Sequence, residues 1–448
     1  MTNMFKKESQ FKTRWYHRMP RYWFQKDLVR PEGVHAAPEV FRLDVAKGVK
    51  PNNKPPVRIY LGTEAGQFRA ERVFVWSVMQ VRDPARVYEI HFMKELKGYD
   101  RSGWKTGFTN YRYGIPAMCG GKGRAIYNDV DQLYLADPGE MFDLDMGPAG
   151  MLCITPRETS VMLIDCEKMI PHWTLVYAQR GKKHKFFRET AQEKNLWGPL
   201  PAEWNARDDE FTADKSKCFH FTTLQTQPWQ PFPDVLRYEP HPDGEVWFSR
   251  ERAADAAGFS VFTKEQPSRR FAEILQQQTA LHGNTNTADK AVETDINQLV
   301  TETIAKDILG VGLDDDVAGI TTPSGLIVVH QKITSAGKRK NNAKKHDGVV
   351  CVDLLPGLPD EDVSWMIDEL FKSANKFVYA SVACFPAKDK LTDGQNARVT
   401  QQLPDWWNGW FTLVGRRHPN IRWKLRSFEK GGKSKLHVGD VRQVSEAA

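Results

Sequence analysis

A strand, a helix and a second strand follow one another between residues 57 and 93, and this order constrains the fold more than any other stretch. Residues 57–63 form a short apolar run that is typical of a buried strand. Residues 69–80 carry apolar side chains at helical spacing, and residues 87–93 alternate in the manner of a second strand. This order predicts a βαβ unit, and therefore a parallel sheet that is covered by helices.

The same order recurs in the last third of the chain and predicts a second α/β domain. Residues 348–353 and 377–384 have the composition of strands, and the predicted helix at 359–371 between them has the acidic first turn that a helix dipole favours. The polar stretch from Gln276 to Thr294 predicts a linker. We therefore expect an N-terminal arm at 1–55, a first α/β domain at 56–275, the linker at 276–294 and a second α/β domain at 295–448.

Composition limits the classes of function. A chain of 448 residues with 40% hydrophobic residues and 14 Trp has enough material for two or three globular domains. The formal net charge of +7 suits phosphate-bearing ligands or an acidic surface but is too diffuse to indicate nucleic acid. The six Cys show no Cys-x-x-Cys spacing, so we expect reduced thiols in a cytoplasmic protein. We find neither a long apolar run nor a hydrophobic leader, and so expect no transmembrane segment and no signal peptide.

Residues 11–24 are dense in aromatic and cationic side chains. Such a mixture suits a membrane surface or a docking partner. The alternative is an irregular arm that lies across a domain, and the sequence leaves both interpretations open.

Two aspartates directly follow a predicted strand. Residues 125–127 are apolar, and Asp129 and Asp131 flank Val130. Side chains of an extended segment alternate between faces, so both carboxylates point the same way while Val130 points into the core. Two neighbouring carboxylates repel each other unless a cation lies between them, and their oxygen atoms suit Mg²⁺ or Mn²⁺. Such an ion could hold the phosphates of a substrate.

The Asp-x-Asp spacing alone is a weak signal, because an Asp-rich turn after a strand has the same pattern. The strand directly before Asp129 and Asp131 distinguishes this pair from three others in stretches typical of loops or helix starts, namely Asp143/Asp145, Asp314/Asp316 and Asp360/Asp362. In open α/β sheets, ligands bind beyond the carboxyl ends of the strands, which is where Asp129 and Asp131 fall.

Further polar residues could complete such a site. His220 ends a short predicted strand; a single His is often structural, but a neutral imidazole is also a suitable third ligand for Mn²⁺. Residues 106–116 are typical of a loop that enters a helix, and this helix would present Arg112. The basic run at 180–185 is most simply a solvated loop.

Residues 57–232 resemble glycosyltransferase family 8. The resemblance is carried, in order and spacing, by Arg-Ala-Ile-Tyr-Asn-Asp-Val-Asp-Gln-Leu (124–133), Ser-Val-Met-Leu-Ile-Asp (160–165), Leu-Pro-Ala-Glu-Trp-Asn (200–205) and His-Phe-Thr-Thr-Leu-Gln-Thr-Gln-Pro-Trp (220–229). It implies a GT-A (Rossmann-like) fold, a Mn²⁺ or Mg²⁺ ion, a nucleotide-sugar donor that is usually a UDP-sugar, and transfer with retention of configuration to a sugar, lipid or protein acceptor.

The resemblance also implies roles for individual residues. Asp129, Asp131 and His220 would bind the metal ion. The donor would lie beside Thr63, Glu64, Arg112 and Asp129, and Arg112 and Asp165 would be catalytic residues. The last of the four motifs departs from the family pattern, because Thr223 stands in place of a Gly and Gln227 in place of a phosphate-binding Lys. We expect Arg112, or a Lys of the 180–185 run, to supply the missing positive charge.

Residues 348–407 resemble the back half of a class I methyltransferase. The Gly-x-Gly-x-Gly loop that such enzymes place against S-adenosylmethionine has no counterpart between 288 and 347, since Gly310-Val-Gly312 is followed by acidic residues. We therefore expect a degenerate domain that does not bind this cofactor. Two other functions stay open, a non-catalytic protein that binds nucleotide-sugars or acts as a scaffold, and an active methyltransferase coupled to the glycosyltransferase.

Overall fold

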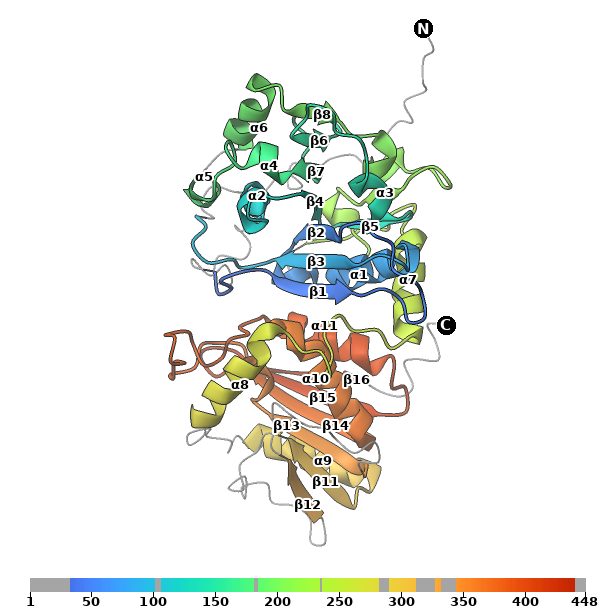
Figure 1. The fold of residues 1–448 in the computed structure, drawn as a ribbon. Coiled ribbons are helices and arrows are strands. Elements are labelled where there is room, and N and C mark those ends of the chain that lie inside the picture. Colours follow the sequence, from blue (N-terminus) through green and yellow to red (C-terminus); the bar gives the residue numbers. More distant parts are fainter. Residues whose placement is uncertain are drawn as a thin grey trace. The chain divides into compact units, whose positions relative to one another are not determined.

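The computed structural model describes residues 33–100, 106–180, 184–233, 236–281, 290–311, 327–331 and 344–439. The chain divides into two compact units, Met1–Phe259 and Ser260–Ala448. Each unit is a mixed α/β structure with parallel strands, as the sequence predicts. Figure 1 shows both units, each with its own sheet and helices.

The first unit has the following helices and strands in chain order: β1 (Glu39–Leu43), β2 (Val57–Gly62), η3 (Ala65–Gln67), α1 (Phe68–Val81), β3 (Tyr88–Met93), η4 (Tyr111–Gly114), α2 (Ile115–Met118), β4 (Arg124–Asp129), β5 (Gln132–Tyr134), α3 (Pro138–Phe142), β6 (Met151–Cys153), β7 (Val161–Asp165), α4 (Cys166–Met169), α5 (Leu175–Arg180), α6 (His184–Glu193), β8 (Trp197–Pro199), η5 (Ala202–Asn205), β9 (Ala206–Arg207), η6 (Asp208–Glu210), β10 (Cys218–His220), η7 (Leu224–Thr226) and α7 (Glu245–Ala256).

The central sheet of this unit has the strand order β1-β3-β2-β4-β7-β6-β8. β2 is parallel to both β3 and β4, so the predicted βαβ unit of β2, α1 and β3 is confirmed. The wider sheet is mixed, because β1 runs antiparallel to β3, and β7 runs antiparallel to β4 and β6. A second sheet has the order β5-β10-β9, and its strand β5 follows the carboxyl end of β4 directly in the chain.

Apolar side chains on one face of the central sheet form a continuous core with the short helices that follow β3. Tyr127 on β4 and Met162 on β7 belong to this core together with Tyr113 of η4 and Phe187 of α6. Tyr113 and Phe187 stack with ring centroids 4.0 Å apart. Helix α1 has its own contacts, since Phe74 packs edge-on against Tyr134 of β5 at 5.7 Å. Burial of these apolar side chains stabilises the sheet. The strand ends, where polar residues lie, are therefore held in defined positions.

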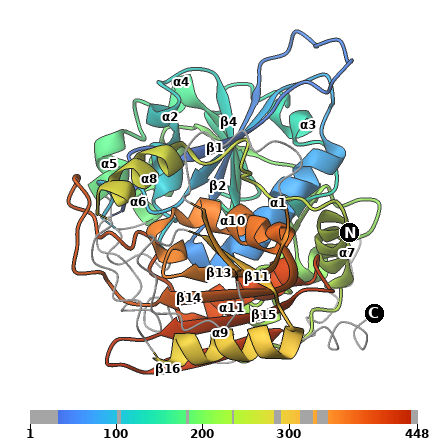
Figure 2. The ribbon, with the colours of Figure 1, turned by 90° about the horizontal axis from the view of Figure 1, so that it is seen from below.

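The second unit comprises α8 (Arg269–Leu281), α9 (Lys290–Thr303), β11 (Asp307–Val311), β12 (Ile327–Gln331), β13 (His346–Val352), η8 (Leu355–Gly357), α10 (Asp360–Ser373), β14 (Ala374–Ala383), α11 (Pro404–Gly415), β15 (Arg422–Phe428) and β16 (Ser434–Gly439). Its sheet has the order β12-β11-β13-β14-β15-β16, in which only the β15–β16 pairing is antiparallel among the described strands. The predicted unit of β13, α10 and β14 is confirmed. Helix α9 lies on the opposite side of these strands from α10 (Figure 2).

The division between the units falls earlier in the chain than the predicted linker. Residues 260–275 belong to the second unit, and parts of the stretch 276–294 lie within α8 and α9. The predicted N-terminal arm contains β1, which pairs with β3 and is therefore part of the first sheet. The aromatic and cationic segment at 11–24 lies outside the described residues.

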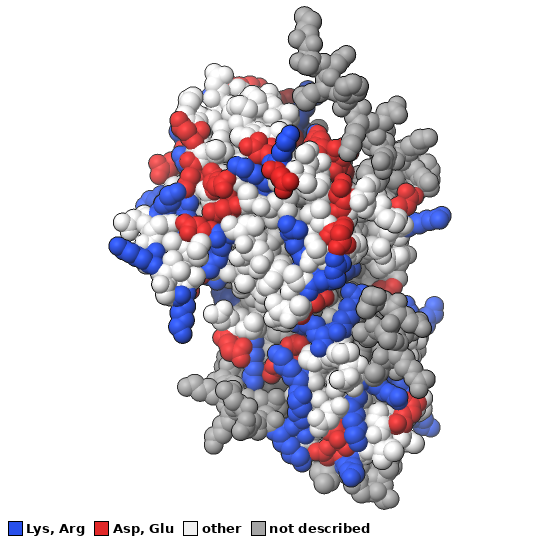
Figure 3. All heavy atoms as spheres, turned by 90° about the vertical axis from the view of Figure 1, so that its right-hand side faces the viewer, with Lys and Arg blue, Asp and Glu red and all other residues white. Residues whose placement is uncertain are grey.

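Surface charge is mixed on the face that Figure 3 shows, where Lys and Arg side chains lie among Asp, Glu and uncharged residues in both units. This distribution fits the diffuse net charge. All six cysteines are free thiols. In the described part of the chain, none of the helices combines the length and the apolar character that crossing a membrane requires.

Candidate active site

The polar cluster at the end of β4 is assembled by two pairings. β4 lies next to β2 in parallel, with Asp129 paired to Gly62, so both strands end at the same edge. β5 pairs antiparallel with β10 and places His220 opposite Gln132. The amide of Phe221 donates to the carbonyl oxygen of Asp131 at 2.9 Å. Pairing between strands far apart in sequence therefore brings His220 to the turn that follows β4.

Two donors, one charged and one neutral, bind the same carboxylate oxygen of Asp129. Arg112 Nη2 lies 2.8 Å from Asp129 Oδ1, and the Tyr127 hydroxyl donates to the same oxygen. Burial and the charge of Asp131 raise the pKa of Asp129 to about 6, although Arg112 and Tyr127 act in the opposite direction. Because Oδ1 holds both donors, the other carboxylate oxygen of Asp129 remains for a ligand.

A glycine makes room for the Tyr127 hydroxyl. A Cβ atom at Gly62 would lie 2.3 Å from this oxygen, closer than any side chain could be accommodated. Gly62 is paired with Asp129 across the β2–β4 boundary. The Tyr127 side chain can therefore cross the end of β2 to reach Asp129 only because residue 62 lacks a side chain.

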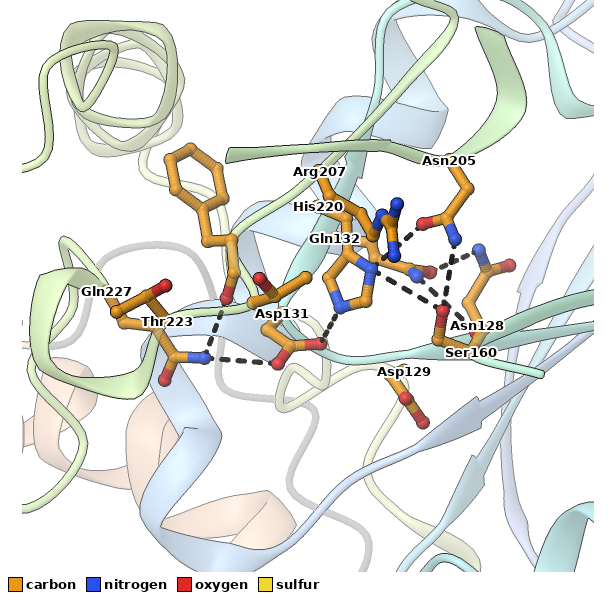
Figure 4. A network of polar contacts seen from close by, with 12 residues as sticks. Asn128, Asp129, Asp131, Gln132, Ser160, Asn205, Arg207, His220, Thr223 and Gln227 are labelled. Carbon is orange, nitrogen blue, oxygen red and sulfur yellow. Dashed lines mark hydrogen bonds and ion pairs between the residues drawn. The ribbon is translucent and has the colours of Figure 1, made fainter. Parts of the chain in front are cut away.

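Asp131 and His220 face each other across the cluster (Figure 4). His220 Nε2 lies 3.2 Å from Asp131 Oδ1, and the His220 side chain is buried. Asp131 Oδ1 is itself buried and makes no hydrogen bond among the described residues. Burial lowers the pKa of His220, but the neighbouring Asp131 carboxylate outweighs it and raises the pKa overall.

The second nitrogen of His220 is also in contact with an oxygen. Nδ1 lies 2.8 Å from Asn205 Oδ1, and the Asn205 amide in turn donates to Ser160 Oγ at 3.2 Å. This arrangement orients the imidazole with its Nδ1–H toward Asn205. Nε2 of the neutral ring then turns a lone pair toward Asp131 Oδ1, and such a pair of acceptors is stable only with a proton or a cation between them.

The three side chains fit a divalent metal ion. One ligand atom from each of Asp129, Asp131 and His220 lies within 4.8 Å of the others. Two carboxylates and one imidazole form a donor set that suits Mn²⁺, and Mg²⁺ less well. The buried Oδ1 of Asp131, which lacks a hydrogen bond, is the kind of atom that a cation would satisfy. A proton competes with the cation for the same ligands.

Arg112 is close to the cluster, but its donor groups hydrogen-bond to other residues of the first unit. Its Nε donates to the Thr109 carbonyl at 3.0 Å, and its Nη1 donates to the Thr159 hydroxyl at 3.1 Å. The guanidinium carbon lies 4.2 Å from the centre of the Tyr127 ring. Despite burial, the Asp129 carboxylate raises the pKa of Arg112. Arg112 therefore acts first on Asp129, and its contact with a donor stays a prediction.

The other predicted site residues lie in different places. Thr63 and Glu64 follow β2 at the edge that carries Asp129, and the Thr63 hydroxyl donates to Glu71 at 2.6 Å. Asp165 does not join the cluster, because the antiparallel pairing of β4 and β7 sets it opposite Arg124, at the other end of β4. There it caps helix α4 by accepting from the amides of Glu167 and Lys168. We therefore leave Asp165 out of the site.

Sequence patterns indicated some of the remaining residues but not their roles. Asn205 belongs to the Leu-Pro-Ala-Glu-Trp-Asn motif, which was the signal that could have identified it as the partner of His220. Gln227, which stands in place of a Lys, hydrogen-bonds to Asp131. Lys182 and Lys183 of the basic run lie outside the described residues, as does the side chain of Lys185, so a role in charge compensation stays a prediction.

Comparisons with known proteins give distant structural similarity. No family model and no curated protein matches the chain. The apo structure of the bifunctional glycosyltransferase WbbM is 13% identical, with a TM-score of 0.33; the match covers 45% of this chain and 53%, about half, of WbbM. The galactosyltransferase LgtC in complex with donor and acceptor sugar analogues is 13% identical, with a TM-score of 0.31 over 43% of this chain and 95% of LgtC.

A further solved structure covers most of the chain. The apo form of the glycosyltransferase GlyE from Streptococcus pneumoniae TIGR4 is 11% identical, with a TM-score of 0.35 over 83% of this chain and 80% of GlyE. The identities and TM-scores of all three structures are low.

Proposed function

We propose that the first unit is a retaining glycosyltransferase of the GT-A type. It would move a sugar from a nucleotide-sugar, most simply a UDP-sugar, to a sugar, lipid or protein acceptor, with Mn²⁺ or Mg²⁺ as the metal ion. The convergence of Asp129, Asp131 and His220 at the carboxyl ends of β4 and β2 is the observation that carries the proposal. The free thiols are compatible with the cytoplasmic setting that we expect.

The side chains of the site have distinct tasks in this proposal. Asp129, Asp131 and His220 would hold the ion, which when bound supplies positive charge against the diphosphate that leaves the sugar. Arg112 and Tyr127 fix one oxygen of Asp129, and Asn205 fixes the ring of His220, so both ligands are oriented before the donor arrives. Thr63 and Glu64, at the end of β2, would lie beside the nucleotide.

A non-catalytic protein that binds nucleotide-sugars is the second candidate. It is favoured by the partners of Arg112, which reduce the charge that this residue can offer a phosphate, and by the neutral Gln227 in the last motif. Both candidates need the same metal ligands. They differ in whether the bound donor turns over.

Hydrolysis of the donor separates these candidates. We would incubate the full chain with a panel of nucleotide-sugars, chosen by thermal-shift screening, with and without Mn²⁺. A glycosyltransferase should release nucleoside diphosphate slowly in the presence of Mn²⁺ and no acceptor. Binding without release, with any donor that raises the melting temperature, would favour the non-catalytic function.

For the second unit, we propose a degenerate methyltransferase-like domain that does not bind S-adenosylmethionine. Gly310 lies within β11 and pairs with both neighbouring strands, so it belongs to the sheet and not to a loop. Residues 314–319 and 321–325, which would have to take the place of the cofactor loop, lie outside the described residues.

A further inference from the structure

Ser160 and Asn205 connect His220 to a carboxylate outside the proposed metal ligands. Asn205 Oδ1 lies 2.8 Å from His220 Nδ1, and the Asn205 amide donates to Ser160 Oγ at 3.2 Å. The hydroxyl and the main-chain amide of Ser160 both donate to Glu158 Oε1, at 2.5 Å and 3.2 Å. Figure 4 shows Ser160 and Asn205 on the side of the His220 ring that faces away from Asp131. A chain of hydrogen bonds therefore leads from Glu158 to the ring nitrogen that does not face the proposed metal site.

Glu158 is held in place through its main chain and through both carboxylate oxygens. Its amide donates to the Thr155 carbonyl at 3.0 Å, in the turn between β6 and β7. Its side chain is 28% exposed, and Oε2 lies 3.7 Å from Arg207 Nη1. Arg207 is itself fixed, because its Nε donates to Glu210 at 2.9 Å. With Oε2 facing a guanidinium group, Oε1 stays directed at Ser160.

The direction of each hydrogen bond in this chain follows from Glu158. A carboxylate accepts hydrogen bonds and cannot donate, so Ser160 gives its single hydroxyl proton to Glu158. Hydrogen bonds to a charged acceptor are the stronger ones, and a distance of 2.5 Å is typical of them. Ser160 Oγ can then only accept from Asn205, which turns the NH₂ group of Asn205 toward Ser160 and its Oδ1 toward His220. His220 donates from Nδ1, and Nε2 keeps the lone pair that a cation needs.

Without an acceptor at residue 158, the chain of hydrogen bonds can reverse. Ser160 could then donate to Asn205 Oδ1, and the NH₂ group of Asn205 would face His220 Nδ1. A neutral imidazole that accepts at Nδ1 carries its proton on Nε2, where the proton excludes a cation. Glu158 thus selects one of two arrangements of the same side chains.

We propose that Glu158 is a positioning residue that fixes the direction of this hydrogen-bond chain and thereby leaves Nε2 of His220 able to bind a divalent cation. This inference rests on the proposed metal-dependent function. It gives a task to a carboxylate that does not bind the ion itself.

Substitutions in the full chain test the inference through Mn²⁺ affinity, measured from the paramagnetic resonance signal of the free ion. Glu158→Leu removes the acceptor and should weaken Mn²⁺ binding by about 10-fold, as is typical of groups that orient metal ligands. Glu158→Gln removes the same negative charge but keeps an acceptor for Ser160, so it should bind Mn²⁺ more tightly than Glu158→Leu. Glu210→Leu is the matched control, because Glu210 also pairs with Arg207 but lies outside the chain of hydrogen bonds; it should bind Mn²⁺ with nearly the affinity of the wild type.

A double variant separates the proposed chain from a merely structural role. If Glu158 acts through Asn205, the substitutions Glu158→Leu and Asn205→Leu remove the same effect, and the double variant should bind Mn²⁺ about as weakly as Asn205→Leu alone. Two independent effects of about 10-fold each would instead multiply to about 100-fold. The melting temperature without metal shows whether each variant is folded. If Glu158→Leu does not fold, Ser160→Ala removes the next link of the chain and should give a similar loss of Mn²⁺ affinity.

Wild-type affinity in Glu158→Leu or Ser160→Ala would overturn the inference and leave the proposed function intact. So would a multiplied loss in the double variant, or a loss in Glu158→Gln or Glu210→Leu that equals the loss in Glu158→Leu. A wild-type protein that binds no Mn²⁺ would overturn both the inference and the proposed function.

Discussion

His220, when neutral, has one ring proton and an oxygen atom close to each of its two ring nitrogens. Asn205 Oδ1 and Asp131 Oδ1 lie 2.8 Å and 3.2 Å from its two ring nitrogens. If the proton is on Nδ1, as the shorter contact favours, Nε2 is left to bind a cation together with Asp131. The hydrogen bond from His220 to Asn205 therefore decides whether the ring can serve as a metal ligand.

Replacement of Asn205 tests this step. Asn205→Leu removes the acceptor and should weaken Mn²⁺ binding by about 10-fold or more. Asn205→Asp keeps an acceptor for Nδ1–H and should retain more affinity than the Leu variant. Calorimetric titration with Mn²⁺ measures both values. Equal affinities for the two variants would mean that Asn205 does not act through the tautomer of His220.

At the level of single residues, the sequence predicted part of the site. Asp129 and Asp131 could be identified because a strand precedes them and their spacing is local. His220 could be named from its residue type only as a possible third ligand, because its pairing with Gln132 is a long-range contact; the resemblance assigned it to the same site. Asp165 was misplaced because an apolar strand pattern does not tell in which direction the strand runs, and β7 is antiparallel to β4.

Among the elements, α10 carries a buried carboxylate that ties it to the segment before α8. Asp362 accepts from the amide and hydroxyl of Ser268 and from Trp365 Nε1. Burial raises the pKa of Asp362 to about 7, although these hydrogen bonds act in the opposite direction. The folded state therefore binds a proton that the unfolded state releases between about pH 4 and pH 7.

The sign of the resulting pH effect follows from this difference. Since the folded state holds the proton more tightly, the free energy of unfolding should fall as pH rises from about 4 to 7, by at most about 1.4 kcal/mol per pH unit. Asp362→Asn should remove this slope, because the Asn Oδ1 can accept from the Ser268 amide and Trp365, and its NH₂ can donate to the Ser268 hydroxyl. Urea unfolding of both proteins at several pH values provides the comparison. Identical slopes would show that Asp362 does not titrate in this range.

The elements themselves were predicted where periodicity is strong. The patterns at 57–93 and 348–384 gave β2, α1 and β3, and β13, α10 and β14, in the correct parallel arrangement. β1 was not predicted, because it is an edge strand within a stretch of mixed composition. The antiparallel places of β7 and β1 depend on non-local pairing, which side-chain periodicity does not encode.

The whole molecule combines two units with separate sheets, and we propose that the site for the metal ion and the nucleotide-sugar lies in the first unit. The second unit is expected not to bind S-adenosylmethionine, because the sequence between residues 288 and 347 lacks the Gly-x-Gly-x-Gly motif that lets the backbone approach this cofactor. Calorimetry of the full chain should detect no binding at millimolar cofactor. Micromolar binding would instead support a second enzymatic activity in residues 260–448.

We propose that Asp129, Asp131 and His220 bind a metal ion that in turn holds a nucleoside diphosphate. The most direct measurement is calorimetric titration of the full chain with a nucleoside diphosphate, with and without Mn²⁺, for the wild type, Asp131→Ala and Asp143→Ala. Asp143 is a suitable control because it belongs to an Asp-x-Asp pair of the same spacing, but pairs with Lys54 and Arg86.

The wild type and Asp143→Ala should bind the nucleotide in a Mn²⁺-dependent manner, and Asp131→Ala should not bind it. Asp143→Ala loses two ion pairs and should be less stable, without a change in this affinity. Equal loss of binding in both variants, or wild-type binding that does not depend on Mn²⁺, would contradict the proposed metal site.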